Sequence, residues 1–262
     1  MKYTAGFIGV GNMGGALLSA VSKSVPSDKL SVFDLNETNA LKAKNDIGAV
    51  ITGIDDLAKN SKFIFIGVKP AVVESVLKSV VGCISKDTVI VSMAAGVSLE
   101  KLSQYSKTDK IIRIMPNTPC AVGEGVVVYS LADGVTDDEH ESFVEIMKGC
   151  GLVDNINESL IDAAMAVSGC GPAFVYMFID AVADGAVKCG LSREKALAYA
   201  KQMVLGSAKM SINSKKHPQQ LKDDVCSPGG TTIEGVMTLE KGAFRHTVSD
   251  AVVSAFNKTS KL

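Results

Sequence analysis

The feature that most constrains this chain is a glycine-rich turn near its amino terminus. An apolar stretch over residues 4–10 runs into Gly9-Val10-Gly11-Asn12-Met13-Gly14, and an Ala- and Leu-rich stretch follows. This is the Gly-x-Gly-x-x-Gly pattern in the strand–turn–helix setting that dinucleotide binding requires. The first glycine makes the turn, the second lets a pyrophosphate approach, and the third lets helix pack on strand. The pattern predicts a Rossmann-type dinucleotide-binding unit.

The end of the next predicted strand carries an acidic residue. Residues 30–33 are mostly apolar and lead to Asp34, about 20 residues after the last glycine, the spacing typical of this fold. An acid at this place can hold the 2′-hydroxyl of the adenosine ribose. The simpler alternative is a turn aspartate ahead of Asn36, which could cap the following helix. Because the acid follows a complete glycine fingerprint, we predict that it contacts the cofactor.

Apolar strands and helices continue to alternate up to residue 158. We expect strands over residues 50–51, 63–66, 88–91, 110–114, 125–130 and 151–154, with helices over 71–81, 99–105 and 137–148. Near-continuous apolar strands separated by helices are typical of a parallel sheet covered on both faces, whose ligands bind beyond the carboxyl ends of the strands. Segments 67–70, 93–96 and 115–119 fall at such ends. Each could equally be ordinary loop punctuation.

After residue 158 the strand pattern stops. Helices are expected over residues 160–167, 172–189, 193–212, 218–225, 231–241 and 243–258. We therefore predict an α/β chain with two domains, residues 1–158 and 159–262. The stretch 173–179 is apolar on every side, and a domain of roughly a hundred residues is too small to bury such a helix alone. A second copy of the chain is the simplest cover, so we expect a homodimer.

A second glycine-rich turn lies near the carboxyl terminus. Ser227-Pro228-Gly229-Gly230 leads to Thr231, and Glu234 three residues later has the spacing of a capping box, so we expect a helix to begin here. A glycine-rich turn entering a helix offers unpaired N–H groups and the positive end of the helix dipole to an anion. Alone, this stretch would be an ordinary capped turn. The glycine fingerprint at the other end of the chain favours a ligand site.

Composition excludes several classes of function. The formal net charge of −1 gives no reason to expect a nucleic acid or an acidic membrane as partner. The six cysteines and three histidines are scattered, without a Cys-x-x-Cys pair, so we expect reduced thiols and no metal site. The longest uncharged run, residues 163–179, is short for a membrane span and is interrupted by Gly169, Gly171 and Pro172. No secretory signal is visible, and we expect a cytoplasmic protein.

Several motifs occur in an order that resembles one enzyme family. After the glycine fingerprint come Val68-Lys69-Pro70, Ala94-Ala95-Gly96, Arg113-x-Met115-Pro116-Asn117-Thr118-Pro119, Gly169-x-Gly171-Pro172-Ala173 and Ser227-Pro228-Gly229-Gly230-Thr231-Thr232. This combination resembles pyrroline-5-carboxylate reductase over nearly the whole chain. The resemblance implies a Rossmann domain followed by an all-helical dimerisation domain. It also implies reduction of 1-pyrroline-5-carboxylate to L-proline with NADPH or NADH, by a homodimer that many members assemble into decamers.

The resemblance assigns roles to individual residues. Cofactor contacts would be Gly9, Gly11, Asn12, Met13, Gly14, Asp34, Lys69, Pro70, Ala94, Ala95, Gly96 and Asn117. Substrate contacts would be Val225, Ser227, Gly230, Thr231 and Thr232. Thr232 would be the catalytic residue, with its hydroxyl on the ring nitrogen of the substrate. No His, Asp or Glu stands out as a dedicated acid, and a protonated imine needs chiefly positioning.

Two alternatives and the choice of cofactor remain open at this point. Another imine or hydroxyacid dehydrogenase could share the architecture, but hydroxyacid enzymes of this type need a catalytic lysine, and residues 160–179 contain none. A non-catalytic dinucleotide-binding protein would keep the fold without turnover. Asp34 would repel the 2′-phosphate of NADPH, and no arginine follows within the next helix, which favours NADH.

Overall fold

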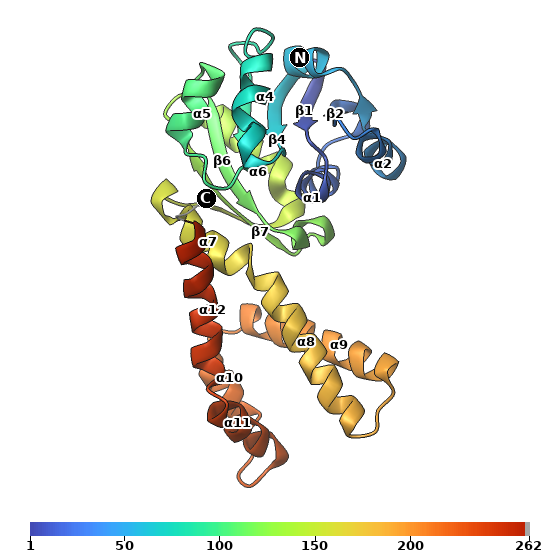
Figure 1. Ribbon diagram of the computed structural model, residues 1–262, viewed down its shortest axis with the longest axis vertical. Helices are drawn as coiled ribbons and strands as arrows, with labels where there is room; N and C mark the ends of the chain where they lie inside the picture. Colours follow the sequence, from blue (N-terminus) through green and yellow to red (C-terminus); the bar gives the residue numbers. More distant parts are fainter. Residues whose placement is uncertain (260–262) are drawn as a thin grey trace. The chain divides into compact units, whose positions relative to one another are not determined.

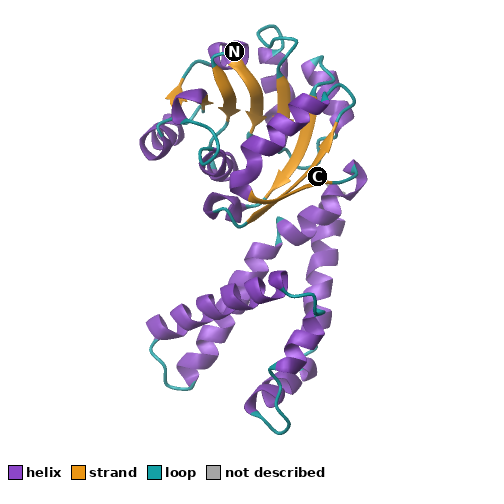
Figure 2. Ribbon diagram, turned by 180° about the vertical axis from the view of Figure 1, so that it is seen from behind, coloured by secondary structure: helices purple, strands orange, loops and turns teal. Residues whose placement is uncertain are grey.

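The computed structural model describes residues 1–259, which form two compact units (Figures 1 and 2). Of the described residues, the first unit contains Met1–Gly169 and 256–259, and the second contains Cys170–Ala255. This division falls after the expected boundary at residue 158, since Ile161 is fully buried against Met115 and Val128 of the first unit. Residues 260–262 of the expected second domain lie outside the described part of the chain.

The first unit is built on one eight-stranded sheet with the order β3-β2-β1-β4-β5-β6-β7-β8. Its strands are β1 (Tyr3–Ile8), β2 (Leu30–Phe33), β3 (Val50–Ile51), β4 (Ser61–Ile66), β5 (Val89–Ser92), β6 (Ile111–Pro116), β7 (Gly125–Leu131) and β8 (Gly151–Asn155). Each strand predicted from the sequence is present. Two βαβ runs that diverge from β1 give the Rossmann arrangement, which confirms the predicted fold class.

The sequence had suggested a sheet that is parallel throughout, but one pair of neighbouring strands is antiparallel. β7 runs antiparallel to β6, with Met115 opposite Val128. Only the short 3-10 helix η3 (Thr118–Val122) connects these two strands, whereas a parallel crossover needs a dozen residues or more. The short connection therefore forces the chain to turn back, and β8 then pairs parallel with β7.

Helices cover both faces of the sheet (Figure 1). They are α1 (Asn12–Val21), α2 (Glu37–Ile47), α3 (Ile54–Asn60), α4 (Val73–Val80), α5 (Leu99–Ser106), α6 (Asp137–Met147) and α7 (Ile161–Ser168). Phe63 and Phe65 of β4 join one hydrophobic cluster, whereas Ile64 and Ile66 join another. Alternate residues of one strand thus feed separate cores, as the continuous apolar strands predicted.

The second unit is entirely helical (Figure 2). It comprises α8 (Gly171–Lys188), α9 (Arg193–Asn213), α10 (Pro218–Asp224), α11 (Thr231–Lys241) and most of α12 (Phe244–Thr259). Val175, Tyr176 and Met177 of α8 are 42%, 61% and 72% exposed in the single chain. The helical run Glu158–Lys188 is also long and apolar enough, by length and composition alone, to cross a membrane. Its exposed apolar surface therefore requires a cover from outside the chain.

Candidate functional site

The glycines of the first turn bring strands and helix into backbone contact. Gly9 has a φ of +90°, a conformation that L side chains rarely adopt. A Cβ atom on Gly14 would lie 2.1 Å from the carbonyl oxygen of Gly9, and one on Gly67 would lie 2.4 Å from the same oxygen. The end of β1, the start of α1 and the end of β4 therefore meet without room for a methyl group.

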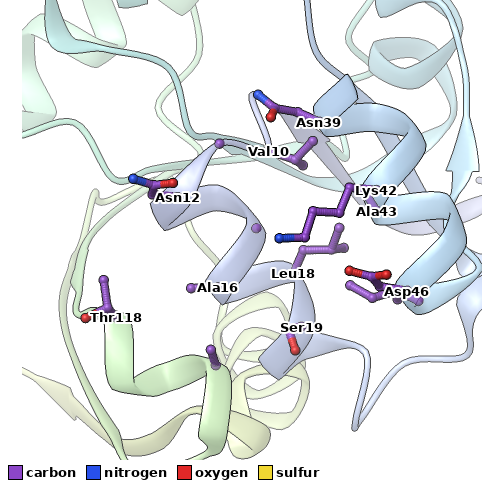
Figure 3. Close-up of a pocket in the computed structure, with 14 residues that line it drawn as sticks. Val10, Asn12, Ala16, Leu18, Ser19, Asn39, Lys42, Ala43, Asp46 and Thr118 are labelled. Carbon is purple, nitrogen blue, oxygen red and sulfur yellow. The ribbon is translucent and has the colours of Figure 1, made fainter. Parts of the chain in front are cut away.

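Gly11 differs, because a Cβ on it would meet nothing within 4 Å. It is the N-cap of α1 and offers no side chain to cap the helix, so the first N–H groups, those of Asn12, Met13 and Gly14, have no partner within the helix. Free N–H groups beside open space fit a pyrophosphate. A cavity of about 480 Å³ opens beside this turn between α1 and α2, and Asn39 lies next to Val10 in it (Figure 3).

Asp34 stands directly after β2, and its half-buried carboxylate is held by three donors. The backbone N–H of Val10 donates to Oδ2 at 2.8 Å and that of Asn36 to Oδ1 at 2.8 Å. The side-chain amide of Asn39 also donates to Oδ2, at 3.2 Å. Asn36 in turn caps α2 by accepting the N–H of Thr38 at 3.1 Å. The turn interpretation of Asp34 is therefore correct, and it leaves one acceptor position free for a ribose hydroxyl.

The other predicted cofactor segments follow β4, which lies beside β1 in the sheet, and β5, which lies beside β4. Lys69 and Pro70 are exposed just beyond β4. Ala94 is buried beyond β5, Ala95 packs against the cluster that contains Ile161, and Gly96 has a φ of +73°. The carboxyl edge of the sheet thus collects these segments next to the glycine turn, as expected for a parallel α/β sheet.

The side-chain amide of Asn117 forms its hydrogen bonds within the protein. It is only 7% exposed, and its side-chain nitrogen donates to the carbonyl oxygen of Ser168 at 2.9 Å. Its side-chain oxygen accepts the backbone N–H of Val126, also at 2.9 Å. The amide joins the ends of β6 and α7 to the start of β7. Its predicted contact with the cofactor stays a prediction.

An ion cluster around a buried arginine next to this segment was not identified from the sequence. Arg113 of β6 is 5% exposed and pairs with Glu158 at 3.0 Å and Asp162 at 3.1 Å. The same Oε1 of Glu158 accepts the N–H of Leu99, the first residue of α5, at 2.7 Å. The cluster fixes α7 and the loop after Gly96 to the sheet. The sequence did contain one sign of this cluster, because an arginine inside the apolar stretch 110–114 would need acidic partners once the strand is buried.

The second glycine turn enters α11, which begins at Thr231 as predicted. The capping box is absent, because Gly230 is the N-cap and makes no side-chain hydrogen bond. Thr231 lies one position inside the helix, where its hydroxyl cannot take the N-cap role. Gly229 has a φ of +66°, and the N–H of Gly230 donates to Ser227 at 3.0 Å. The start of α11 therefore keeps its N–H groups available for an anion.

The predicted substrate side chains surround that helix start. Val225 ends α10 and is 62% exposed, and Ser227, Thr231 and Thr232 are exposed as well. These residues all belong to the second unit, whereas the predicted cofactor residues all belong to the first. Each set is assembled within its own unit.

The cysteines form no disulfide in this chain. All six are free, and Cys120 and Cys150 are fully buried. The neighbouring Cys120 thiol and burial raise the pKa of Cys150, which therefore stays protonated. Within residues 1–259, no group of three or more His, Cys, Asp or Glu side chains could hold a metal ion.

The matches to known proteins extend over the whole chain. The family model for pyrroline-5-carboxylate reductase dimerisation matches residues 158–262, and that for NADP oxidoreductase, coenzyme F420-dependent, matches residues 4–96. The chain is 39% identical to pyrroline-5-carboxylate reductase of Pisum sativum, over all of this chain and 96% of the relative. It is 38% identical to that of Escherichia coli, over all of this chain and 99% of the relative.

Solved structures agree with the sequence relatives. Pyrroline carboxylate reductase of Plasmodium falciparum with NADP bound superimposes with a TM-score of 0.88 at 34% identity, covering 99% of this chain and 98% of that one. The enzyme of Streptococcus pyogenes gives a TM-score of 0.86 at 31% identity, covering 98% of each chain. With two relatives near 40% identity over its full length and this shared fold, the chain belongs to the pyrroline-5-carboxylate reductase family.

Proposed function

We propose that this protein reduces 1-pyrroline-5-carboxylate to L-proline with a hydride from NAD(P)H, the last step of proline biosynthesis. The observation that carries the proposal is that α1 and α11 both start uncapped after a turn that contains two glycines. Each is suited to an anion, and the reaction brings two: the cofactor pyrophosphate and the substrate carboxylate. The full-length relatives carry the same reaction in their names.

The chemistry divides between the cofactor and this chain. The reduced nicotinamide supplies the hydride, which goes to the carbon of the protonated C=N bond while the bond's electron pair passes to the ring nitrogen. The N–H groups at the start of α1 bind the pyrophosphate, and Asp34 accepts a hydrogen bond from the ribose. The N–H groups at the start of α11 bind the substrate carboxylate, and the hydroxyl of Thr232 accepts a hydrogen bond from the ring N–H.

This arrangement needs no strong acid from the protein. The protonated imine already carries the positive charge that hydride transfer neutralises, and anion binding at α11 aligns the ring. No His, Asp or Glu is in the predicted substrate set, in keeping with a catalyst that works by positioning.

We also propose a cytoplasmic homodimer, its further assembly into decamers, and no membrane or nucleic-acid partner. The exposed apolar residues of α8 lie within the region matched by the dimerisation model, which supports a second copy rather than lipid as their cover. The net charge of −1 supports the absence of a nucleic acid.

The test is the loss of reduced-nicotinamide absorbance with pyrroline-5-carboxylate, with NADH and NADPH run in parallel. Thr232→Ala should lower kcat at least tenfold and leave the KM for the cofactor unchanged. Thr238→Ala, at an exposed threonine later in α11, is the matched control and should retain full activity. Unchanged kinetics of Thr232→Ala would remove Thr232 from the mechanism. A folded dimer that binds NADH but oxidises none would instead be a non-catalytic binding protein.

A further inference from the structure

We propose that Asn39 fixes the carboxylate of Asp34 so that this enzyme selects NADH over NADPH. The inference rests on the proposed function, since it concerns the cofactor of that reaction. Asp34 would meet the 2′ position of the adenosine ribose, which is a hydroxyl in NADH and a phosphate in NADPH. The structure shows why the carboxylate remains in place when either arrives.

The three donors to Asp34 come from separate parts of the fold. Val10 belongs to the turn after β1, Asn36 to the loop after β2, and Asn39 to the first turn of α2. Two of these donors are backbone N–H groups, which cannot turn away. Asn39 supplies the side-chain donor and shares Oδ2 with Val10, so this oxygen is held by two donors from different segments of the chain.

The remaining hydrogen-bond acceptor position of the Asp34 carboxylate suits a hydroxyl and not a phosphate. A carboxylate offers about four acceptor positions, three of which are filled, one of them on Oδ1. A ribose hydroxyl can donate to the vacant position on Oδ1. A phosphate monoester near pH 7 is largely a dianion, which has no proton to donate and is repelled by the carboxylate. To admit it, the carboxylate would have to rotate out of its hydrogen bonds.

The surroundings of Asp34 do not compensate for a phosphate. Residues 35–41 contain no Lys or Arg, and Glu37 adds a second negative charge. Asp34 and Glu37 line a cavity of about 420 Å³ at the ends of β2 and β3. The first cation after Asp34 is Lys42, which lines the other cavity and extends over Leu18 of α1 (Figure 3).

Two backbone N–H groups at the start of α2 are also occupied already. Its dipole and N–H groups would attract a phosphate. However, Asn36 already accepts the N–H of Thr38, and Asp34 accepts that of Asn36. These two N–H groups are therefore held by acceptors of the protein and are not offered to the extra phosphate of NADPH.

The experiment compares kcat/KM for NADH and NADPH with pyrroline-5-carboxylate as substrate, together with the Kd of each reduced cofactor from nicotinamide fluorescence without substrate. The wild type should favour NADH at least tenfold in both measurements. Asp34→Ser should reduce that preference at least tenfold, chiefly through better NADPH binding. Asn39→Ala should reduce the preference for NADH at least threefold, because the carboxylate is then free to rotate. The change should come from the KM for the cofactor and not from kcat.

Asn45→Ala is the matched control, since Asn45 is an exposed asparagine of the same helix. It should keep the wild-type ratio. A wild type that uses NADPH as well as NADH would overturn the proposal. Equal ratios for Asn39→Ala and Asn45→Ala would overturn the role of Asn39, and an unchanged ratio in Asp34→Ser would overturn that of Asp34 even if Asn39→Ala failed to fold.

The fluorescence measurement separates this inference from the proposed function. If neither cofactor reduced pyrroline-5-carboxylate but NADH still bound more tightly than NADPH, the reaction would be wrong and the selectivity correct. If the reaction proceeded and both cofactors bound equally, the selectivity alone would be wrong.

Discussion

At the scale of single residues, the glycines of the first turn perform two separable functions. Gly14 allows backbone contact with Gly9, whereas Gly11 leaves space beside the start of α1. Both belong to the same sequence fingerprint, and the fingerprint alone does not distinguish them. The space available to a Cβ does, and it predicts different consequences for the same substitution.

Gly14→Ala should destabilise the fold by about 1–3 kcal/mol, because its Cβ would overlap the carbonyl oxygen of Gly9. Gly11→Ala should leave the melting temperature unchanged and raise the KM for the cofactor at least tenfold, since its methyl group occupies the space predicted for the pyrophosphate. Thermal unfolding and cofactor titration of both variants check this. Equal melting temperatures for the two variants would contradict the assignment.

Asn117→Ala should lower stability rather than act on the cofactor directly. It would leave the partly buried carbonyl of Ser168 and N–H of Val126 without their partner, at up to about 1–3 kcal/mol for each group left unpaired. Urea unfolding measures the loss. If stability were unchanged and only the KM for the cofactor rose, Asn117 would be a cofactor contact, as the family resemblance implies.

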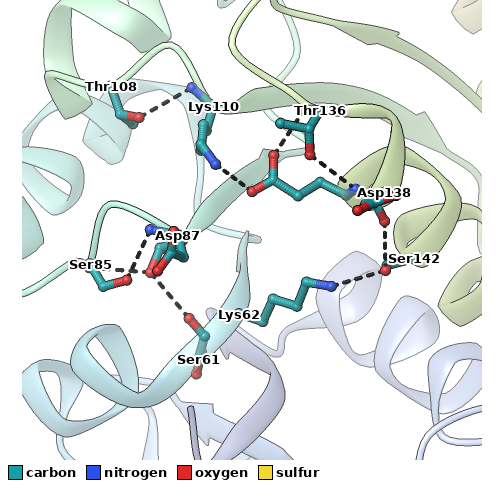
Figure 4. A network of polar contacts seen from close by, with 11 residues as sticks. Ser61, Lys62, Ser85, Asp87, Thr108, Lys110, Thr136, Asp138 and Ser142 are labelled. Atoms are coloured by element: carbon teal, nitrogen blue, oxygen red, sulfur yellow. Dashed lines mark hydrogen bonds and ion pairs between the residues drawn. The ribbon is translucent and has the colours of Figure 1, made fainter.

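At the scale of elements, α6 is tied to the sheet by a polar network at its start (Figure 4). Thr136 and Glu139 form a capping box, and Lys110, the residue before β6, pairs with Glu139 at 2.5 Å. Burial raises the pKa of Glu139, but Lys110 and Thr136 outweigh it, and the pKa is lowered overall. The charged form of Glu139 is therefore favoured by folding.

The pH dependence of stability follows from this shift. A carboxyl whose pKa falls on folding stabilises the protein above its unfolded pKa of about 4.3, and the contribution is lost as pH falls through the lower folded value. Glu139→Gln should therefore be less stable than the wild type at pH 7, with a difference that shrinks toward pH 3. Urea unfolding at several pH values measures it. A difference that did not vary with pH would exclude the charge as its cause.

The elements were largely predictable because their signals are local. The apolar run 63–66 and the glycines of residues 9–14 each specify their own structure. The direction of β7 depends on how short η3 is, and the pairing of Arg113 with Glu158 and Asp162 joins residues 45 and 49 positions apart. Such features depend on the assembled fold. The capping box at Thr231 failed by a single position, which a sequence pattern does not resolve.

The same division between local signals and features of the assembled fold applies to the candidate site. Motifs marked the segments at the ends of β4 and β5, and the topology then placed them beside the first turn. The link between Asn39 and Asp34 could not be inferred, because a side-chain amide five positions from an acid has many possible partners. Only the start of α2 brings the two groups together.

At the scale of the whole molecule, the exposed apolar face of α8 should make stability depend on association. Met177→Glu should give a monomer by light scattering, because a charge would replace a side chain that is 72% exposed in the single chain. Lys188→Ala, at an exposed position in the last turn of α8, is the control and should stay dimeric. The melting temperature of the wild type should rise with protein concentration. A monomeric wild type would refute the expected dimer.

The path of the chain between the units has a consequence for its synthesis. The chain leaves the first unit after Gly169, forms the second unit, and returns to the first unit at Phe256. Thr259, at the end of α12, is buried. The sheet leaves the ribosome early, yet its unit is complete only once residue 259 has emerged. The first unit therefore receives its last described segment only after the helical unit has been synthesised, and no single cut in the chain separates the two units.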